Sequence, residues 1–264
     1  MYAFDYQKVS SVADAAAALA KNPDAKLLAG GQTLIASMKL RLANPPQLLD
    51  LGNVPELRGI KVDAGSVTIG AMMRHGEVAA SSEVKRAIPA LAALAAGIGD
   101  RMVRNMGTIG GSIANNDPAA DYPAGVVGLN ATVVTNKRKI AADDFFKQLF
   151  ETALAPGEII TAVSFPVPKR AAYMKFKNPA SRYAIVGVFV AKTPGGVRVA
   201  VTGAGPCVFR APAMETALAA NFSPDAIKDI QIPQDGLNSD IHASAEYRAH
   251  LVNVMARRAV AACA

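Results

Sequence analysis

The sequence predicts an α+β fold, because segments with helical periodicity and segments rich in β-forming residues do not alternate regularly along the chain. From Gly157 the pattern changes to β-rich runs, and the chain ends in helical segments. Of the 264 residues, 51% are hydrophobic and 19% are charged, which excludes intrinsic disorder and a coiled coil. The length predicts one to two domains, with a boundary near 166–170, where Pro166 and Pro168 interrupt the chain.

The N-terminal part is expected to begin with a helix over 11–21, capped by Ser10 or Ser11. Thr33 is expected to cap a second helix, which ends before Asn44-Pro45-Pro46. The remaining elements before the glycine-rich middle are strands over 26–29, 47–51 and 67–70 and an alanine-rich helix over 89–96.

The middle of the chain changes character from Gly97 to Pro123, where glycines are frequent and no period is sustained. We expect a long loop there, and such loops inside a compact domain are usually functional. The segments expected after it are a hairpin over 131–142, strands over 158–165, 171–177, 184–192 and 197–202, and helices over 211–220 and 243–262.

The net charge of +7 permits several kinds of acidic partner, but the basic residues are scattered and Trp is absent. Nucleic-acid binding is therefore not expected. The two cysteines, Cys207 and Cys263, and the three histidines have no zinc or iron–sulfur spacing. We expect Cys207 to be buried and Cys263 to lie in a frayed end. The first residues show no signal peptide and no apolar run is long enough for a membrane span, so a cytoplasmic protein is expected.

Two glycine pairs, in Ala29-Gly30-Gly31-Gln32-Thr33 and in Thr108-Ile109-Gly110-Gly111-Ser112, are candidates for phosphate binding. Glycine allows a backbone to approach a ligand closely, successive N–H groups can surround a phosphate, and the Thr and Ser hydroxyls add donors. Each pair taken alone is also typical of an ordinary tight turn. Neither matches the G-x-G-x-x-G or the P-loop pattern, so a Rossmann dinucleotide-binding motif and a P-loop are excluded.

Five segments together resemble the FAD-binding medium subunit of molybdenum hydroxylases, the family of carbon monoxide dehydrogenase and xanthine dehydrogenase. In chain order they read LLAGGQTL (27–34), MKLRLANPPQLLDL, IGAMMRHGEVAAS, GIGDRMVRNMGTIGGSIANNDPAADYPA (97–124) and VTGAGPCVFRAPAMETAL. The resemblance implies a two-lobed FAD-binding domain of the vanillyl-alcohol-oxidase-like (PCMH) type over 1–168, with a boundary between its two subdomains near 55–60. A smaller C-terminal α/β domain of the CO-dehydrogenase flavoprotein type is implied over 169–264.

The resemblance also implies which residues contact FAD. Asp121 would accept hydrogen bonds from the flavin nucleotide, although it could equally cap a helix at Tyr122-Pro123. Lys177 would lie near the isoalloxazine, or else be a solvated strand-end lysine, and Tyr183 would lie near the flavin ring or be a half-buried strand aromatic. The residues of the two glycine loops that would hold the pyrophosphate are Ala29, Gly30, Gly31, Gln32, Thr33 and Leu34 in the first and Thr108, Ile109, Gly110, Gly111 and Ser112 in the second.

The implied function is that of an electron-transfer subunit of an oxidoreductase. A small partner subunit would carry two 2Fe–2S clusters and a large partner subunit the molybdopterin, in a heterotrimer or a dimer of heterotrimers. Electrons would pass from the clusters to FAD and on to an external acceptor, and no residue of this chain would act catalytically on the organic substrate. The alternatives are a free-standing FAD oxidase or dehydrogenase of the same superfamily and a non-redox module that binds a phosphate or nucleotide. The substrate and the acceptor are not specified by this sequence.

Overall fold

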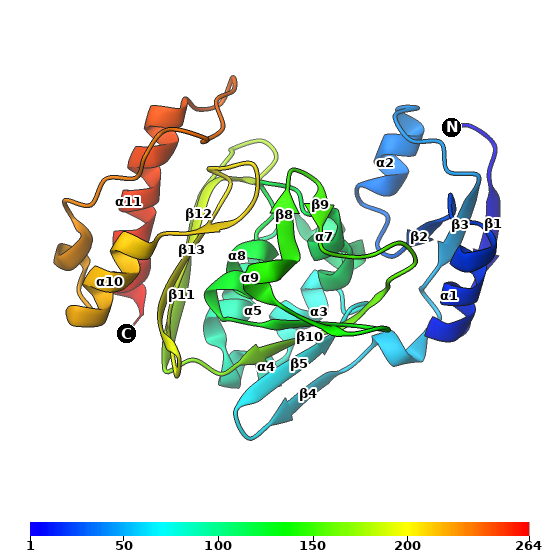
Figure 1. Ribbon diagram of the computed structural model, residues 1–264, viewed down its shortest axis with the longest axis horizontal. Coiled ribbons are helices and arrows are strands. Elements are labelled where there is room, and N and C mark those ends of the chain that lie inside the picture. Colours follow the sequence, from blue (N-terminus) through cyan, green and yellow to red (C-terminus); the bar gives the residue numbers. More distant parts are fainter. Residues whose placement is uncertain (264) are drawn as a thin grey trace.

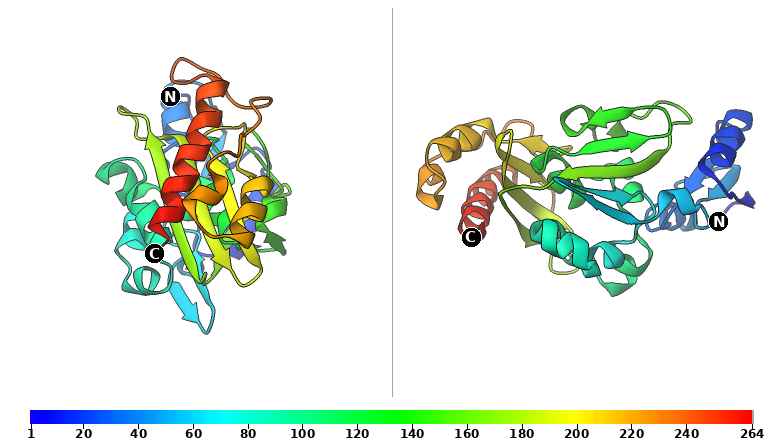
Figure 2. Two further views of the ribbon diagram at one scale, coloured as in Figure 1. Left: turned by 90° about the vertical axis from the view of Figure 1, so that its left-hand side faces the viewer. Right: turned by 90° about the horizontal axis from the view of Figure 1, so that it is seen from below.

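The computed structural model describes residues 1–263, which form three successive groups of helices and strands (Figure 1). Each group contains its own sheet and its own cluster of buried apolar side chains. The groups follow one another along the molecule in sequence order, with the N-terminal group at one end and the C-terminal group at the other (Figures 1 and 2). Helices and sheets are thus mixed along the chain, as the α+β prediction requires.

The N-terminal group is a parallel three-stranded sheet of order β1-β3-β2 with two helices. Ser11 caps its first helix by accepting a hydrogen bond from the Asp14 N–H at 3.0 Å, as predicted. Thr33 precedes its second helix, but the side chain makes no capping hydrogen bond, because the Thr33 backbone is itself helical. The elements are β1 (Asp5–Lys8), α1 (Val12–Lys21), β2 (Lys26–Leu28), α2 (Leu34–Lys39) and β3 (Gln47–Asp50).

The middle group is built on an antiparallel five-stranded sheet of order β4-β5-β10-β6-β7. The strands are β4 (Ile60–Asp63), β5 (Ser66–Gly70), β6 (Thr132–Thr135), β7 (Lys139–Ala141) and β10 (Ile160–Pro166), with a short pair β8 (Phe146–Gln148) and β9 (Glu151–Thr152) beside them. The hairpin predicted over 131–142 is confirmed as β6 and β7. The helices before the glycine-rich region are η1 (Pro55–Leu57), α3 (His75–Ala80), α4 (Ser82–Ala87) and α5 (Pro89–Ala96), and α9 (Ala142–Phe145) follows β7.

The prediction of a long loop over 97–123 is wrong, because this segment contains short helices. These are α6 (Arg101–Met106), α7 (Ile109–Asn115) and the start of α8 (Tyr122–Gly128). Asp100 caps α6 through the Val103 N–H at 2.9 Å, and Thr108 caps α7. Helices of six or seven residues make fewer than two turns, so they leave no periodic pattern of apolar residues to detect.

The C-terminal group is an antiparallel four-stranded sheet, β11-β12-β13-β14, with helices on both faces. One face packs against α5 and α8 of the middle group, and the other against α10 and the long C-terminal α11 (Figure 2). The elements are β11 (Arg170–Lys177), β12 (Ala184–Thr193), β13 (Gly196–Thr202), β14 (Phe209–Arg210), α10 (Pro212–Ala220), η2 (Pro224–Ile227) and α11 (Ala245–Ala262).

The predicted environments of the two cysteines are both wrong. Cys263 is only 2% exposed, whereas Cys207 is partly exposed, and both are free thiols. The reason is that α11 extends to Ala262 and packs against the sheet, so its end is not frayed. Within residues 1–263, no helix combines the length and the apolar character needed to cross a membrane.

Candidate functional site

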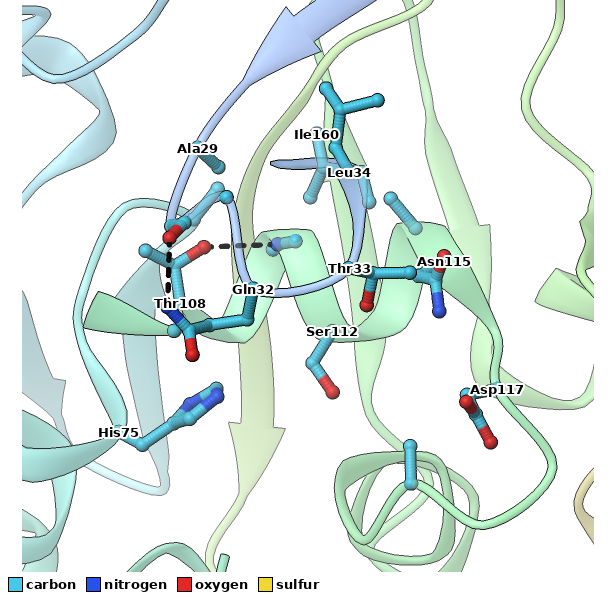
Figure 3. Close-up of a pocket in the computed structure, with 18 of the residues that line it drawn as sticks. Ala29, Gln32, Thr33, Leu34, His75, Thr108, Ser112, Asn115, Asp117 and Ile160 are labelled. Carbon is cyan, nitrogen blue, oxygen red and sulfur yellow. Dashed lines mark hydrogen bonds between the residues drawn. The ribbon is translucent and has the colours of Figure 1, made fainter. Parts of the chain in front are cut away.

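A cavity of about 520 Å³ lies where the N-terminal and middle groups meet (Figure 3). The turn before β12 also contributes residues to its wall. The glycine loop that follows β2 forms one side of the cavity, and the start of α7 forms the opposite side. Segments that are far apart in the sequence therefore build one site. The lining residues from the two predicted glycine loops are Ala29, Gly30, Gly31, Gln32, Thr33, Leu34, Thr108, Gly110, Gly111 and Ser112.

The first glycine loop offers a row of free backbone donors to the cavity. Gly31 has φ +70°, a conformation that glycine adopts without strain, and it turns the chain from β2 toward α2. Within the residues that the structure describes, the backbone N–H groups of Gly30 to Leu34 donate to no protein acceptor. The Gln32 side-chain amide donates to the Gly30 carbonyl at 3.3 Å and keeps the loop compact. Such a row of N–H groups suits an anionic group such as a phosphate.

The second glycine loop is organised differently, because its N–H groups are already paired. Thr108 is 3% exposed, and its hydroxyl accepts from the Gly111 N–H at 3.1 Å. The Ile109 N–H donates to the Met73 carbonyl at 3.1 Å, and the Gly110 N–H donates to the Ala71 carbonyl at 2.8 Å. This loop therefore faces the cavity with the start of a capped helix and its side chains, not with a row of free donors.

The glycines also let the two loops and their supports pack closely. A Cβ on Gly30 would lie 2.7 Å from the Gly107 Cα, so Gly30 packs directly against the backbone that precedes α7. A Cβ on Gly110 would lie 2.6 Å from the Ala71 Cβ. Both positions require glycine for packing within the protein, whatever ligand the cavity holds.

Two hydroxyl groups and two polar side chains complete this part of the wall. Thr33 and Ser112 point their hydroxyls toward the cavity, and Asn115 and Asp117 lie beyond them at the end of α7 (Figure 3). Among residues 1–263, the Thr33 and Ser112 hydroxyls make no hydrogen bond with another protein group, so both can donate to a ligand.

Asp121 lines the cavity but does not cap α8, although it occupies the N-cap position. Its carboxylate forms an ion pair with Lys175 at 2.9 Å and accepts a hydrogen bond from the Tyr173 hydroxyl at 2.5 Å. Burial raises the pKa of Asp121, and the Lys175 ammonium opposes that increase. The alternative of a capping role for the side chain is therefore wrong.

The remaining predicted residues lie in different surroundings. Tyr183 lines the cavity with about half of its surface exposed, and partial burial raises its pKa. Lys177 is exposed at the end of β11 and does not line the cavity. Ile109 is fully buried in the core beneath the second loop.

His75 is a cavity residue that the sequence analysis did not single out. Its side chain is 5% exposed and points from the start of α3 toward Gln32 (Figure 3). Its Nδ1 is buried and, among the described residues, unpartnered. Burial lowers the pKa of His75 to about 4, and Arg104 acts in the same direction. The imidazole is therefore neutral at physiological pH, and only its position in the fold reveals that it lies at this site.

Glu158 and Arg182 are two further cavity residues that the sequence analysis missed. Glu158 is held by Arg138 at 3.0 Å, and Arg182 lies in a turn with φ +63°. Neither belongs to a glycine loop or to a spaced motif, so no sequence pattern identifies them.

The site as a whole fits an FAD-type dinucleotide. Free backbone donors and hydroxyls suit the phosphates, while a buried carboxylate, an unpartnered imidazole nitrogen and an exposed tyrosine offer further contacts. The cavity thus has the chemistry expected of a class of protein that binds a large, phosphate-bearing cofactor.

Comparison with known proteins identifies the family. Residues 2–168 match the family described as the FAD binding domain in molybdopterin dehydrogenase. The chain is 35% identical to the glyceraldehyde dehydrogenase medium chain of Sulfolobus acidocaldarius, over 97% of this chain and 96% of that one. It is 36% identical to the nicotine 6-hydroxylase medium subunit of Paenarthrobacter nicotinovorans, over 98% and 96% of the two chains. A chain of the reconstituted CO dehydrogenase from Oligotropha carboxidovorans superposes with a TM-score of 0.90 at 34% identity, covering 99% of this chain and 98% of that chain.

The chain therefore belongs to the FAD-binding medium subunits of molybdenum hydroxylases, and it is a flavoprotein component of an oxidoreductase. The resemblance stated from the sequence is confirmed.

Proposed function

We propose that this chain carries FAD as the electron-transfer subunit of a molybdenum hydroxylase. It would receive electrons from the 2Fe–2S clusters of a small partner subunit and pass them to an external acceptor. The observation that carries this proposal is the row of free N–H groups from Gly30 to Leu34, which line one cavity together with the Ser112 hydroxyl of α7. FAD, when bound, supplies the capacity to take up two electrons and release them one at a time.

The residues that would hold FAD fall into two sets. The first glycine loop and the hydroxyls of Thr33 and Ser112 would bind the pyrophosphate as hydrogen-bond donors. Asp121 would accept hydrogen bonds from the flavin nucleotide, and Tyr183 would contact the flavin ring at the mouth of the cavity. Lys177 remains a predicted contact, although its exposure at the end of β11 offers no support for it.

The domain organisation proposed for this function is a PCMH-type FAD-binding domain over 1–168 and a C-terminal domain over 169–264. The FAD-binding domain would have two lobes, the N-terminal group and the middle group. Their separate sheets and apolar clusters, with the cavity between them, support this division and a boundary near 55–60.

The partners proposed are a large subunit with the molybdenum cofactor and a small subunit with the iron–sulfur clusters. The chain has only two cysteines, and Cys207 and Cys263 lie in different parts of the C-terminal group. Since each 2Fe–2S cluster requires four protein ligands, the clusters must belong to another chain. The medium chain or subunit named in several relatives is consistent with such an assembly.

Affinity purification of the tagged chain from its natural host tests the proposal. We expect chains that contain iron and molybdenum to co-purify, and FAD in the complex to be bleached when the substrate of the large subunit is added. A yellow chain that purifies alone and is reduced directly by an organic substrate would contradict the proposed electron path.

A further inference from the structure

We propose that Lys175 is a buried cation behind the wall of the FAD site and that it acts as a positioning residue, holding Asp121 and the Arg182 turn in the cavity wall. This inference rests on the proposed FAD site, because Asp121 and Arg182 both line that cavity. Lys175 itself does not line it, so its effect on a ligand must pass through these neighbours.

The Lys175 ammonium joins three separate segments of the chain. It donates to the Asp121 carboxylate at 3.1 Å, to the Gly97 carbonyl at 2.8 Å and to the Arg182 carbonyl at 3.0 Å. An ammonium has three N–H donors, so each donor has an acceptor. The side chain is 9% exposed, and these contacts fix the end of α5, the start of α8 and the turn before β12 to one point.

The strand geometry of β11 places Lys175 inside the molecule. Side chains alternate along a strand, so Tyr173 and Lys175 point toward the middle group, whereas Met174 and Phe176 pack on the side of α11. The register with β12 shifts between Phe176 and Lys177, where the ladder ends. Lys175 is therefore the lysine that the sheet directs toward Asp121.

A buried carboxylate keeps its charge only if it is paired. Asp121 is 4% exposed and accepts a hydrogen bond from the Tyr173 hydroxyl. The negative charge of Asp121 also contributes to raising the pKa of Tyr122 and of Tyr183. Burial raises the pKa of each of these three tyrosines, so they stay neutral at physiological pH. The Lys175 ammonium opposes the effect of burial on the pKa of Asp121 and so favours its ionised form.

The expected role of this ion pair is to present a carboxylate acceptor at a fixed place in the wall. Without the ammonium, burial favours the protonated acid, which presents an O–H donor in place of one acceptor. The Arg182 carbonyl would also lose its hydrogen bond from Lys175. Protonation of Asp121 and release of the Arg182 turn would both weaken the fit of the cavity to FAD.

FAD titration of the full chain, followed by fluorescence at several values between about pH 6 and pH 9, tests this inference. We expect Lys175→Met to bind FAD about tenfold more weakly near neutral pH, with the affinity recovering as the pH rises and Asp121 ionises. The matched control is Lys169→Met, an exposed lysine just before the same strand, which should bind like the wild type at every pH. Lys175→Arg keeps the charge and should retain the flat pH profile of the wild type.

The double variant Lys175→Met/Asp121→Asn removes the carboxylate that Lys175→Met leaves unpaired. It replaces the single variant in the FAD titration if Lys175→Met does not fold. It should bind FAD weakly and without pH dependence. The inference is overturned if either variant binds FAD as tightly as Lys169→Met, or if the loss in Lys175→Met is the same at every pH. A folded wild-type chain that takes up no FAD would instead overturn the proposed function.

Discussion

At the scale of single residues, the glycines of the two loops have different structural roles. Gly31 provides a left-handed turn in the loop that carries the free donors, whereas Gly110 fits α7 against Ala71. Ser112 follows Gly110 and Gly111 in the sequence, and its hydroxyl points toward the cavity. Within residues 1–263, this hydroxyl makes no hydrogen bond with another protein group. Folding and ligand binding can therefore be tested at different positions of one short motif.

Replacing Ser112 with alanine tests binding without disturbing the fold. We expect Ser112→Ala to weaken FAD binding by about 1 kcal/mol, or fivefold to tenfold, because one neutral hydrogen bond to the ligand is lost. The melting temperature of the FAD-free chain should not change. Ser66→Ala is the control, since Ser66 is a partly exposed serine in the β4–β5 hairpin, away from the cavity. Unchanged FAD affinity in Ser112→Ala would show that this hydroxyl does not face the cofactor.

Replacing Gly110 with valine tests the packing role. A Cβ at this position would lie 2.6 Å from the Ala71 Cβ and 2.8 Å from the Ala71 carbonyl oxygen, so we expect Gly110→Val to destabilise the FAD-free chain by about 2–3 kcal/mol. Urea unfolding measures this loss. The control is Gly195→Val, where the nearest atom to an added Cβ is the Thr193 hydroxyl oxygen at 3.8 Å. Equal stability of the two variants would mean that Gly110 is not limited by packing.

At the scale of elements, sequence patterns predict α5 and several strands, including the short β2, β3 and β5, but miss the short helices α6 and α7. The alanine-rich helix α5 has the bounds expected, and the strands expected over 184–192 and 197–202 form the β12–β13 hairpin, which turns at Pro194-Gly195. The region of α6 and α7 was expected to be a loop, because its helices are short and its glycines normally disfavour helices. Here Gly110 and Gly111 lie in the first turn of α7, where the Thr108 cap and packing on Ala71 stabilise the helix.

A buried carboxylate also joins the β6–β7 hairpin to the segment that precedes β10. Glu158 accepts from Arg138, from the Thr135 hydroxyl at 2.7 Å and from the Ala155 N–H at 2.8 Å. The hydrogen bond from Arg138 is the main reason that the pKa of Glu158 falls from 4.5 to about 2. Since Glu158 lines the cavity as well, these contacts fix part of its wall.

This network gives a pH dependence of stability with a definite sign. Because the pKa of Glu158 is lower in the folded state, its contribution is fully present above pH 4.5 and is lost as the pH falls toward about 2. We expect the melting temperature of the wild type to fall more steeply over this range than that of Glu158→Gln. Parallel curves for the two proteins, measured by circular dichroism, would show that Glu158 does not contribute through its charge.

At the scale of the whole molecule, the site exists only after distant segments have assembled. The glycine loops could be recognised in the sequence because each is local, whereas His75, Glu158 and Lys175 reach the site only through sheet register and helix packing. Lys175 is the clearest example of a residue whose position cannot be predicted from the sequence. The prediction from the sequence selects Lys177, and only the position of the strand against Asp121 shows that Lys175 is the buried lysine and Lys177 the exposed one.

If the cavity between the glycine loops holds FAD, the purified, folded chain contains flavin, and its flavin content can be measured. We expect about one FAD per chain, released on unfolding, and a melting temperature that rises with added FAD because the ligand binds only the folded state. We also expect Ser112→Ala to retain less FAD than Ser66→Ala. A folded, colourless chain whose melting temperature does not respond to FAD would contradict FAD binding in this cavity.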